Sequence, residues 1–355
     1  MRLSLQSDRR RRHILESLRT MRPLESARSS ESGPMRIKTV AHGIALHPTR
    51  TARIIATKTL PSWSLINYAF TAPRFYRTHG YLPRLPSNQS ATLNDYIYHR
   101  MIRGGWTDLE RRATDKEIAK SVASELCPTI RTARIVRTID HTKMTEAEFR
   151  EEISPFYGQR VVAKSTHGCG DIVFLQDKPD DAAVTALYRT RGWNPYYEIR
   201  AEVYRKLARK VIIEEQLPDG ESDDYKFICA GGKVIFCQLD QNRFTKPTKT
   251  YLTPDFKIIP EKWGTATPNK TVTPPSELPQ LLRVARQLSE PFEFVRIDLY
   301  NTRNGIFLGE FTFTPGGAFE VFGRHEFGVK LLSEVRAAIE RRQPVNIRRP
   351  VLQTS

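Results

Sequence analysis

The strongest constraint on the fold is a pair of alternating segments near the C-terminus, Phe294–Tyr300 and Ile306–Thr314. In both segments, apolar and polar residues alternate with the period of two that is typical of a β-strand with one buried face. The connection, residues 301–305, is short and ends in Gly305, so we expect an antiparallel hairpin. Such a hairpin gathers the polar side chains of both segments on one face of a sheet.

Charged side chains dominate that polar face. Pairing of the strand ends, Tyr300 with Ile306, fixes the rest of a regular ladder. Arg296 then lies opposite Glu310, and Asp298 is a diagonal neighbour of Glu310, about 7–8 Å away by backbone. Two carboxylates at this spacing suit Mg²⁺, which takes one or two carboxylates together with substrate phosphates. A surface ladder of ion pairs is the alternative and, by spacing alone, the commoner one, but the Gly-rich loop directly after the second strand favours a ligand site.

Further helices and strands follow from similar patterns. Thr114 and Glu117 have the spacing of a capping box, and the apolar positions after them predict a helix that ends before Pro128. Thr145 and Glu148 open a second helix in the same way. We expect strands at 161–164, 172–175, 211–214, 225–229 and 234–239, and another helix at 277–288.

The cysteines have neither Cys-x-x-Cys spacing nor paired histidines beside them, so zinc is not indicated. They are Cys127, Cys169, Cys229 and Cys237. The last two flank Gly231-Gly232, which has the composition of a two-residue hairpin turn. Such a turn sets Cys229 opposite Val234. It sets Cys237 opposite Lys226, so the two thiols do not face each other, and we expect reduced thiols in a cytosolic protein.

The charge of the chain is strongly positive and unevenly distributed. The 56 Lys and Arg against 39 Asp and Glu give +17 over 355 residues, and residues 1–60 alone carry 13 basic and 4 acidic residues, or +9. Residues 1–35 combine an Arg run with a Ser-rich stretch and little apolar periodicity, which predicts a disordered basic arm. No apolar segment follows the Arg run, and no stretch reaches the roughly 18 residues of a membrane helix. We therefore expect a cytoplasmic chain whose arm makes at most peripheral contact with an anionic membrane.

Seven short stretches, taken in order, carry a family resemblance. They are Thr114-Asp115-Lys116, 161–170 (VVAKSTHGCG), 212–217 (IIEEQL), 224–227 (DYKF) with Gly231-Gly232-Lys233, Asn242-Arg243, 294–300 (FVRIDLY) and 309–317 (GEFTFTPGG). Through them, residues from about 85 to 330 resemble the TupA-like ATP-grasp family. The resemblance implies an α+β fold, the ATP-grasp fold, in which two α+β subdomains clamp ATP. An N-terminal domain that helps to form the acceptor site precedes them in the chain.

The same resemblance suggests how the chain divides. The expected parts are a basic arm (1–35), an N-terminal domain (36–112), a small ATP-grasp subdomain with a central region (113–210), a C-terminal ATP-grasp subdomain (211–340) and a basic tail (341–355).

The resemblance also implies two cofactors, ATP and Mg²⁺, and residues for the ATP. Lys116 and Lys164 would place compact positive charges on the phosphates, and the loop with Ser165, Gly168 and Gly170 would close over them. His167, inside this loop, is interpreted as a packing residue rather than a ligand. Glu214, Glu215 and Leu217 match the hinge that binds adenine. Asp224 matches the acid that binds the ribose hydroxyls, with Asp223 as the alternative. Lys226 and Arg243 are two further candidate cations.

For the metal, the resemblance implies Asp298 and Glu310 as the Mg²⁺ carboxylates. Arg296 matches the Arg that stabilises the reaction intermediate, so Arg296 and Lys164 are the expected catalytic residues. Thr312 completes the metal set, although many ATP-grasp ligases carry Asn at this position. A hydroxyl there can hold a metal-bound water as well as coordinate the ion.

The activity implied is ATP-dependent ligation of a carboxylate to an amine through an acylphosphate, in cell-surface polysaccharide or peptide-polysaccharide assembly. An ATP-grasp kinase that phosphorylates a sugar or carboxylate would need the same ATP site, so the motifs leave it open. A basic nucleic-acid-binding protein is the third interpretation. It is the weakest of the three, because the Arg- and Tyr-containing stretches at 76–84 and 96–100 match no known nucleic-acid module.

Overall fold

The computed structural model describes residues 56–168, 170–218, 223–242, 246–264, 269 and 271–342. All of them belong to one compact unit. The predicted basic arm, nearly all of the basic tail, Cys169 and Arg243 lie outside the described residues. Within these residues, no helix combines the length and the apolar character needed to cross a membrane.

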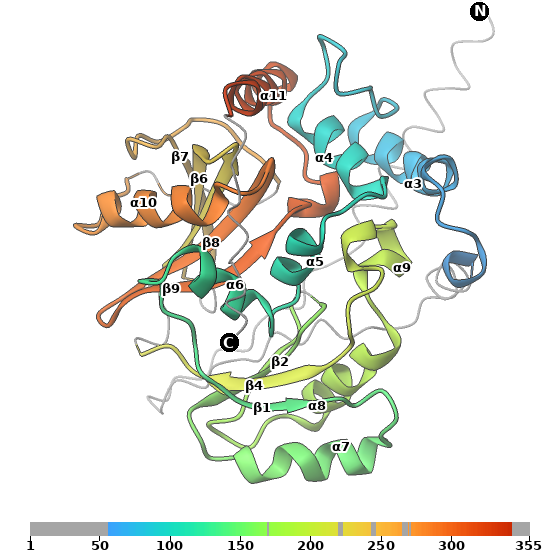
Figure 1. Cartoon of the computed structure of the whole chain (residues 1–355), viewed down its shortest axis with the longest axis vertical. Coiled ribbons are helices and arrows are strands. Elements are labelled where there is room, and N and C mark those ends of the chain that lie inside the picture. Colours follow the sequence, from blue (N-terminus) through green and yellow to red (C-terminus); the bar gives the residue numbers. More distant parts are fainter. Residues whose placement is uncertain are drawn as a thin grey trace, which may run out of the picture. The chain divides into compact units, whose positions relative to one another are not determined.

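Two antiparallel sheets form the framework (Figure 1). The four-stranded sheet has the order β1-β4-β2-β3, and the five-stranded sheet the order β7-β6-β5-β8-β9. The strands of the first are β1 (Ile135–Ile139), β2 (Val161–Ser165), β3 (Ile172–Phe174) and β4 (Val211–Glu215). Those of the second are β5 (Asp224–Ala230), β6 (Lys233–Gln241), β7 (Thr248–Leu252), β8 (Phe294–Thr302) and β9 (Gly305–Thr312).

Helices cover both sheets, and threonine caps begin several of them. The α-helices are α3 (Ser64–His79), α4 (Leu93–Ile102), α5 (Asp108–Thr114), α6 (Ala119–Leu126), α7 (Glu146–Ile153), α8 (Asp181–Arg189), α9 (Pro195–Ile199), α10 (Leu278–Ser289) and α11 (His325–Glu340). Thr92, Thr107 and Thr145 form capping boxes with the acid three residues later. The predicted helix after Thr145 is therefore confirmed.

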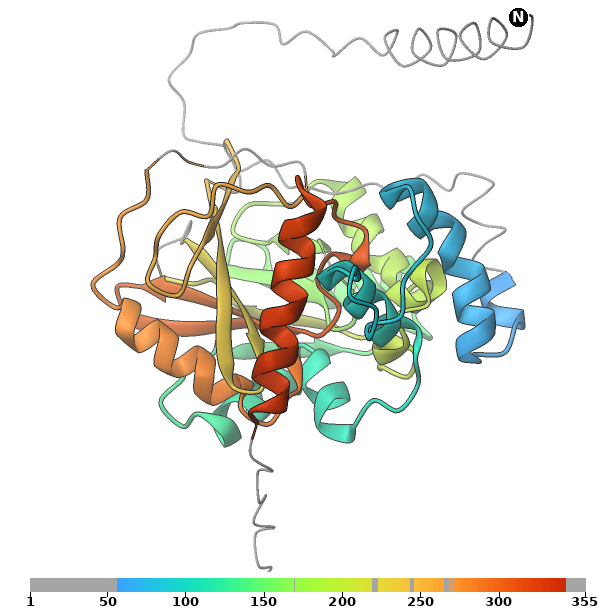
Figure 2. The same ribbon diagram turned by 90° about the horizontal axis from the view of Figure 1, so that it is seen from above.

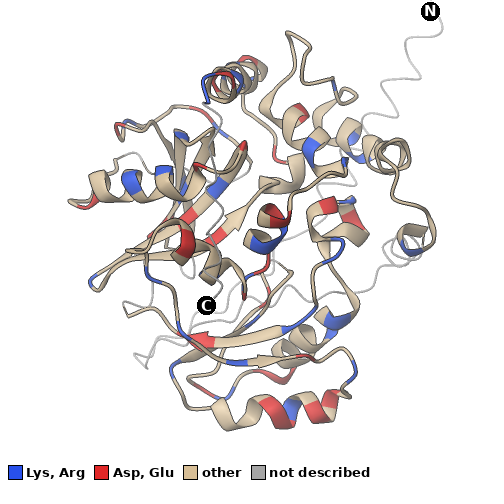
Figure 3. Ribbon diagram, viewed as in Figure 1, with Lys and Arg blue, Asp and Glu red and all other residues tan. Residues whose placement is uncertain are grey.

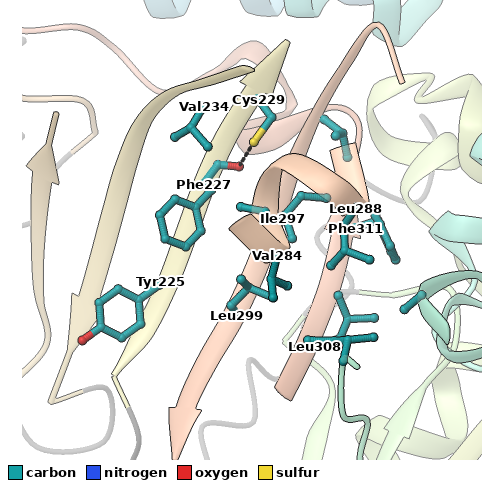
Figure 4. Close-up of a cluster of buried hydrophobic side chains, with 14 of the residues drawn as sticks. Tyr225, Phe227, Cys229, Val234, Val284, Leu288, Ile297, Leu299, Leu308 and Phe311 are labelled. Atoms are coloured by element: carbon teal, nitrogen blue, oxygen red, sulfur yellow. Dashed lines mark hydrogen bonds between the residues drawn. The ribbon is translucent and has the colours of Figure 1, made fainter. Parts of the chain in front are cut away.

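The five-stranded sheet is buried on both faces. On one face, side chains such as Phe227 and Leu299 pack with Leu281 and Leu288 of α10 and with apolar residues of α6 (Figure 4). On the other, Ile228 and Phe236 belong to a cluster with apolar residues of α4 and α11. Helix α11 lies along this face of the sheet (Figure 2). The four-stranded sheet has its own core under α7 and α8.

Three expectations about organisation are corrected by this packing. Residues 56–112 do not build a separate core, because Phe75 of α3 and Leu93 of α4 share a cluster with the five-stranded sheet. β4 lies in the four-stranded sheet, so the chain passes between the sheets after Glu215 rather than at 211. Thr114 ends α5, and α6 begins after Ile118 without a side-chain cap, so the predicted capping box does not form. Asp115 Oδ1 accepts the N–H of Glu117 at 2.9 Å in the turn between the two helices.

The two predicted hairpins form, and each contains a bulge that shifts its register. At the Gly231-Gly232 turn, Cys229 pairs with Val234 as predicted, but Ile235 is extra, so Cys237 pairs with Phe227 and not with Lys226. In the C-terminal hairpin, Asn301 rather than Tyr300 pairs with Ile306. Gly309 is extra there, and the ladder beyond it is shifted by one residue.

Candidate active site

The bulge at Gly309 brings the predicted metal carboxylates directly opposite each other. Asp298 pairs with Glu310, and Arg296 pairs with Thr312, so the expected pairing of Arg296 with Glu310 is corrected. Arg296 Nε donates to Asp298 Oδ1 at 2.6 Å, and its Nη2 donates to Glu310 Oε1 at 2.8 Å. The Thr312 hydroxyl donates to the same Glu310 oxygen at 3.0 Å. One guanidinium therefore bridges two carboxylates on the polar face of the hairpin.

The two carboxylates titrate differently. Burial raises the pKa of Asp298 to about 7, against the opposing effect of Arg296 and Lys226. Burial also acts on Glu310, but there the charges of Lys116 and Arg296 prevail and lower its pKa to about 2. The pKa values of two neighbouring carboxyl groups diverge in this way because ionisation of one makes ionisation of the other less favourable.

A buried lysine extends the cluster across the sheet. Lys226 of β5 lies opposite Asp298 of β8, and its Nζ is ion-paired with Asp224, with Asp240 at 3.0 Å and with Asp298 at 3.9 Å. These carboxylates raise the pKa of Lys226 despite its burial. Asp240 was not predicted. It lies opposite Asp224 on β6, a position that the register of the first hairpin determines.

Lys116 connects this cluster to the other sheet. Its Nζ lies 3.8 Å from Glu310 Oε2 and donates to the carbonyl of Gly168, in the predicted phosphate loop. Its backbone N–H donates to the carbonyl of Thr166 at 3.0 Å. The turn before α6 thus links the predicted metal residues to the predicted phosphate loop.

The phosphate loop follows β2 and is closely packed. The Ser165 hydroxyl donates to Asp171 Oδ2 at 2.8 Å, and burial raises the pKa of Asp171. A Cβ on Gly168 would overlap both of these side chains, and Gly170 has a φ of +81°, which side chains rarely adopt. His167 is buried, and its Nε2 lies 2.9 Å from the carbonyl of Trp193, which agrees with its predicted packing role.

The second predicted lysine, Lys164, has an acidic partner and an unpredicted companion. Glu214 accepts from Lys164 through Oε1 and from Lys120 through Oε2, the latter at 2.6 Å. Burial acts against ionisation of Glu214, but the two lysines lower its pKa. Lys120 was missed, although it follows Lys116 by four residues in the predicted helix, a spacing that places both on one helical face.

The other predicted ATP residues do not contact Lys116 or Lys164. Glu215 follows Glu214 on β4, points to the opposite side and bonds Arg134 Nε at 3.0 Å. Leu217 is half-buried beyond the end of β4. Asp224 is buried against Lys226, whereas its competitor Asp223 is partly exposed and accepts from Gln241 at 2.9 Å.

The donor set fits the implied metal in kind. Among the described residues no three His, Cys, Asp or Glu side chains form a group that could hold a metal ion. Asp298 and Glu310 nevertheless offer paired hard oxygen ligands beside the Thr312 hydroxyl. This matches Mg²⁺, which takes few protein carboxylates and completes its shell with phosphate oxygens and water.

Comparison with known proteins settles the family. The model of the TupA-like ATP-grasp family matches residues 100–335, about two thirds of the chain and most of the residues described above. The chain belongs to the TupA-like ATP-grasp family. The predicted resemblance and the ATP-grasp fold are thereby confirmed. No curated protein matches the chain.

Several solved structures are similar to this TupA-like protein at low identity. A D-alanine-D-alanine ligase from Helicobacter pylori is 15% identical over 63% of this chain and 61% of its own, with a TM-score of 0.39. The VanG D-Ala:D-Ser ligase from Enterococcus faecalis is 15% identical over 70% of this chain and 64% of its own, with a TM-score of 0.38. The chain therefore spans less than two thirds of the length of both ligases. A RimK domain ATP-grasp protein from Sphaerobacter thermophilus is 15% identical over 65% of this chain and 69% of its own, with a TM-score of 0.36.

Proposed function

We propose that the protein is an ATP- and Mg²⁺-dependent ligase that joins a carboxylate to an amine. The observation that carries the proposal is the convergence of cations on one carboxylate pair. Lys116, Lys226 and Arg296 reach Asp298 or Glu310 from both sides, and Lys116 also contacts the Gly-rich loop. Such a site is suited to a polyphosphate with its metal ion.

In the proposed reaction, a substrate carboxylate oxygen attacks the γ-phosphorus of ATP, and ADP leaves. The amine then attacks the carbonyl carbon of the acylphosphate, an amide forms, phosphate leaves, and the nitrogen loses its proton. This chemistry needs positioning and charge neutralisation rather than a protein nucleophile.

Each residue has a proposed task in these steps. Lys116 and Lys164 offset phosphate charge, and the loop from Ser165 to Gly170 covers the phosphates. Arg296 donates to the oxygen that becomes negative when the amine attacks. Asp298 and Glu310, with Thr312 nearby, would hold Mg²⁺, which neutralises phosphate charge when bound.

The nucleotide's other end has a less complete set of contacts. We propose the β4 end, Glu214 to Leu217, for adenine. Asp224 is the proposed partner of the ribose hydroxyls, with Asp223 as the alternative. Lys226 and Arg243 are proposed as further cations toward the phosphates. We further propose that the reaction serves cell-surface polysaccharide or peptide-polysaccharide assembly and takes place in the cytoplasm.

A product assay tests the reaction class. The protein is incubated with Mg²⁺-ATP and mixtures of amino acids and sugar acids, and ADP, phosphate and product mass are followed. A ligase releases ADP and phosphate in equal amounts and forms a product that lacks phosphorus. ADP without free phosphate, together with a phosphorylated product, would establish a kinase instead.

Substitution at the site tests the assignment. Lys164→Ala and Glu310→Gln should each lower ATP turnover by at least about 10²-fold, because each removes a charge that the reaction needs. The exposed residues Lys143 and Glu151 provide matched controls, Lys143→Ala and Glu151→Gln, which should keep wild-type turnover. Wild-type turnover in either site variant would reject that residue's role.

A further inference from the structure

Helix α3 presents an apolar stripe to the outside. Leu65, Ala69, Pro73 and Tyr76 recur at the spacing of one helical face and are all exposed. Leu65 is 78% and Tyr76 is 54% exposed, and Trp63, the N-cap residue, is 68% exposed. Figure 2 shows α3 at the margin of the described chain.

The opposite face of α3 is the one that packs. Asn67 Nδ2 donates to the carbonyl of Ile102 at 2.9 Å, the Thr71 hydroxyl lies 2.8 Å from that of Tyr98, and Phe75 is fully buried. The apolar stripe is therefore not the face through which α3 packs against α4 and the core. Exposed apolar residues also concentrate in α3 and the segments beside it, because six of the nine large exposed apolar side chains of the described residues lie between residues 60 and 85.

The chain segment that carries the stripe has charge of a single sign. From residue 32 to residue 94 the chain contains no Asp or Glu, and the first carboxylate after this stretch, Asp95, is buried. Lys58, Arg74 and Arg77 lie on or beside α3, and Figure 3 accordingly draws no acidic residue on this helix. In a chain with 39 acidic residues, so long an acid-free stretch gives the segment that carries the apolar face only positive charge. An acid that reaches α3 from another element, Glu202, is buried and lies 3.5 Å from Asn67 on the packed side of the helix.

We propose that the exposed face of α3 docks on the surface of an anionic lipid bilayer. Trp and Tyr have an apolar body and a polar tip, which suits the boundary between headgroups and acyl chains. Lysine and arginine beside an apolar face add attraction to anionic headgroups, and the two contributions together support reversible binding. Nucleic acid would contact the positive charges but would not bury the aliphatic Leu65. A protein partner rich in carboxylates would likewise leave Trp63 and Leu65 without an apolar contact. The proposal is independent of the proposed reaction.

Sedimentation with vesicles tests the proposal on the full-length protein. Vesicles of phosphatidylcholine with about 30% phosphatidylglycerol should carry the protein down at about 0.1 M salt, and vesicles of phosphatidylcholine alone should carry down at least tenfold less. The double variant Trp63→Ser/Leu65→Ser should lose at least tenfold in binding, and Lys58→Gln/Arg77→Gln should lose severalfold. Ile258→Ser is the matched control, since Ile258 is exposed elsewhere and should bind as wild type.

The outcomes separate the possible occupants of the face. All variants should keep wild-type thermal unfolding and, if the ligase proposal holds, wild-type ATP turnover, since none lies in the candidate site. Equal binding of wild type and Trp63→Ser/Leu65→Ser would overturn the proposal and assign any membrane contact to another segment, such as the basic arm. A dimer of the wild-type protein by light scattering that becomes a monomer in this variant would overturn it in favour of self-association. Retention on RNA that the variant loses would overturn it in favour of nucleic acid.

Discussion

At the scale of single residues, Glu214 has the most revealing environment. Its carboxylate is only 7% exposed and lies between Lys164 and Lys120, so Lys164, which is proposed to meet phosphate, already has an anionic partner. ATP phosphates must compete with Glu214 for the ammonium group of Lys164. The strength of the contact between Lys164 and phosphate therefore depends on how strongly Glu214 attracts Lys164, and so on whether Lys120 also pairs with Glu214.

Lys120→Met should raise the KM for ATP about tenfold, a change of roughly 1.4 kcal/mol in binding free energy. With one lysine gone, Glu214 holds Lys164 more firmly, and Lys164 is less available to phosphate. Steady-state kinetics over a range of ATP concentrations measures the effect. Lys143→Met, an exposed lysine outside the site, serves as the control.

A double variant decides whether the effect passes through Glu214. If it does, adding Glu214→Gln to Lys120→Met should partly restore the KM, because a neutral side chain no longer retains Lys164. Strictly additive effects of the two substitutions would contradict this coupling.

At the scale of elements, the loop between β2 and β3 depends on one small residue. A methyl group at Gly168 would overlap Asp171 and Ser165, whose mutual hydrogen bond shapes the loop. Gly168→Ala should therefore weaken ATP binding at least tenfold while the unfolding temperature changes little, because the loop lies outside the hydrophobic clusters.

Calorimetric titration with ATP and a thermal melt measure these two quantities. Gly104→Ala is a suitable control, since Gly104 has open space around its Cα and no positive φ. An unchanged ATP affinity in Gly168→Ala would show that the loop adjusts without loss, and would argue against its role as a phosphate cover.

Most strands of the described residues could be predicted from the sequence, but their registers and most of the helices could not. The helix after Thr145 begins at its capping box, and the strand segments lie where apolar alternation places them. The C-terminal register failed because a regular ladder was assumed. Along β9 and the residue that follows it, the buried positions change from Ile306 and Leu308 to Phe311 and Phe313, from even to odd numbers. This change of parity is the sequence signal of the bulge at Gly309.

The candidate site shows the same division between chemistry and geometry. Lys116, Asp298 and Glu310 could be selected by type and motif, and the structure brings them together. Lys120 and Asp240 were missed because their importance comes from partners on other elements, Glu214 and Lys226, rather than from their own neighbours in sequence.

At the scale of the whole molecule, two buried histidines make stability depend on pH. Burial lowers the pKa of both His141 and His167 to about 4, from about 6.5 in an unfolded chain. Between these values the unfolded state binds a proton at each histidine and the folded state does not. The free energy of unfolding therefore falls as the pH falls from 6.5 toward 4.

The free energy of unfolding in urea should accordingly fall by about 2 kcal/mol per histidine between pH 7 and pH 5. The variant His141→Gln/His167→Gln should be less stable at pH 7, because both rings are buried, but should lose less between the two pH values. A double variant with the full pH dependence of the wild type would assign that dependence to other groups.

The organisation of the molecule was the hardest part to predict. A separate N-terminal domain was expected from the family resemblance, yet Phe75 and Leu93 complete the core of a sheet whose strands begin more than 100 residues later. Contacts over such separations leave no local pattern in the sequence, because any apolar helix face would serve equally well.

The burial of β5 on both faces limits which substitutions the strand can tolerate. All seven residues, Asp224–Ala230, are buried, whereas β1, at the edge of the other sheet, has one buried residue of five. In an ordinary strand every second position can change with little penalty, because it faces water. β5 has no such position. One face of the strand packs on α10, and the residues of the other face either belong to the charged cluster or pack on α11. Neutral substitutions should therefore accumulate in β1 over evolutionary time, while β5 stays nearly constant along its whole length.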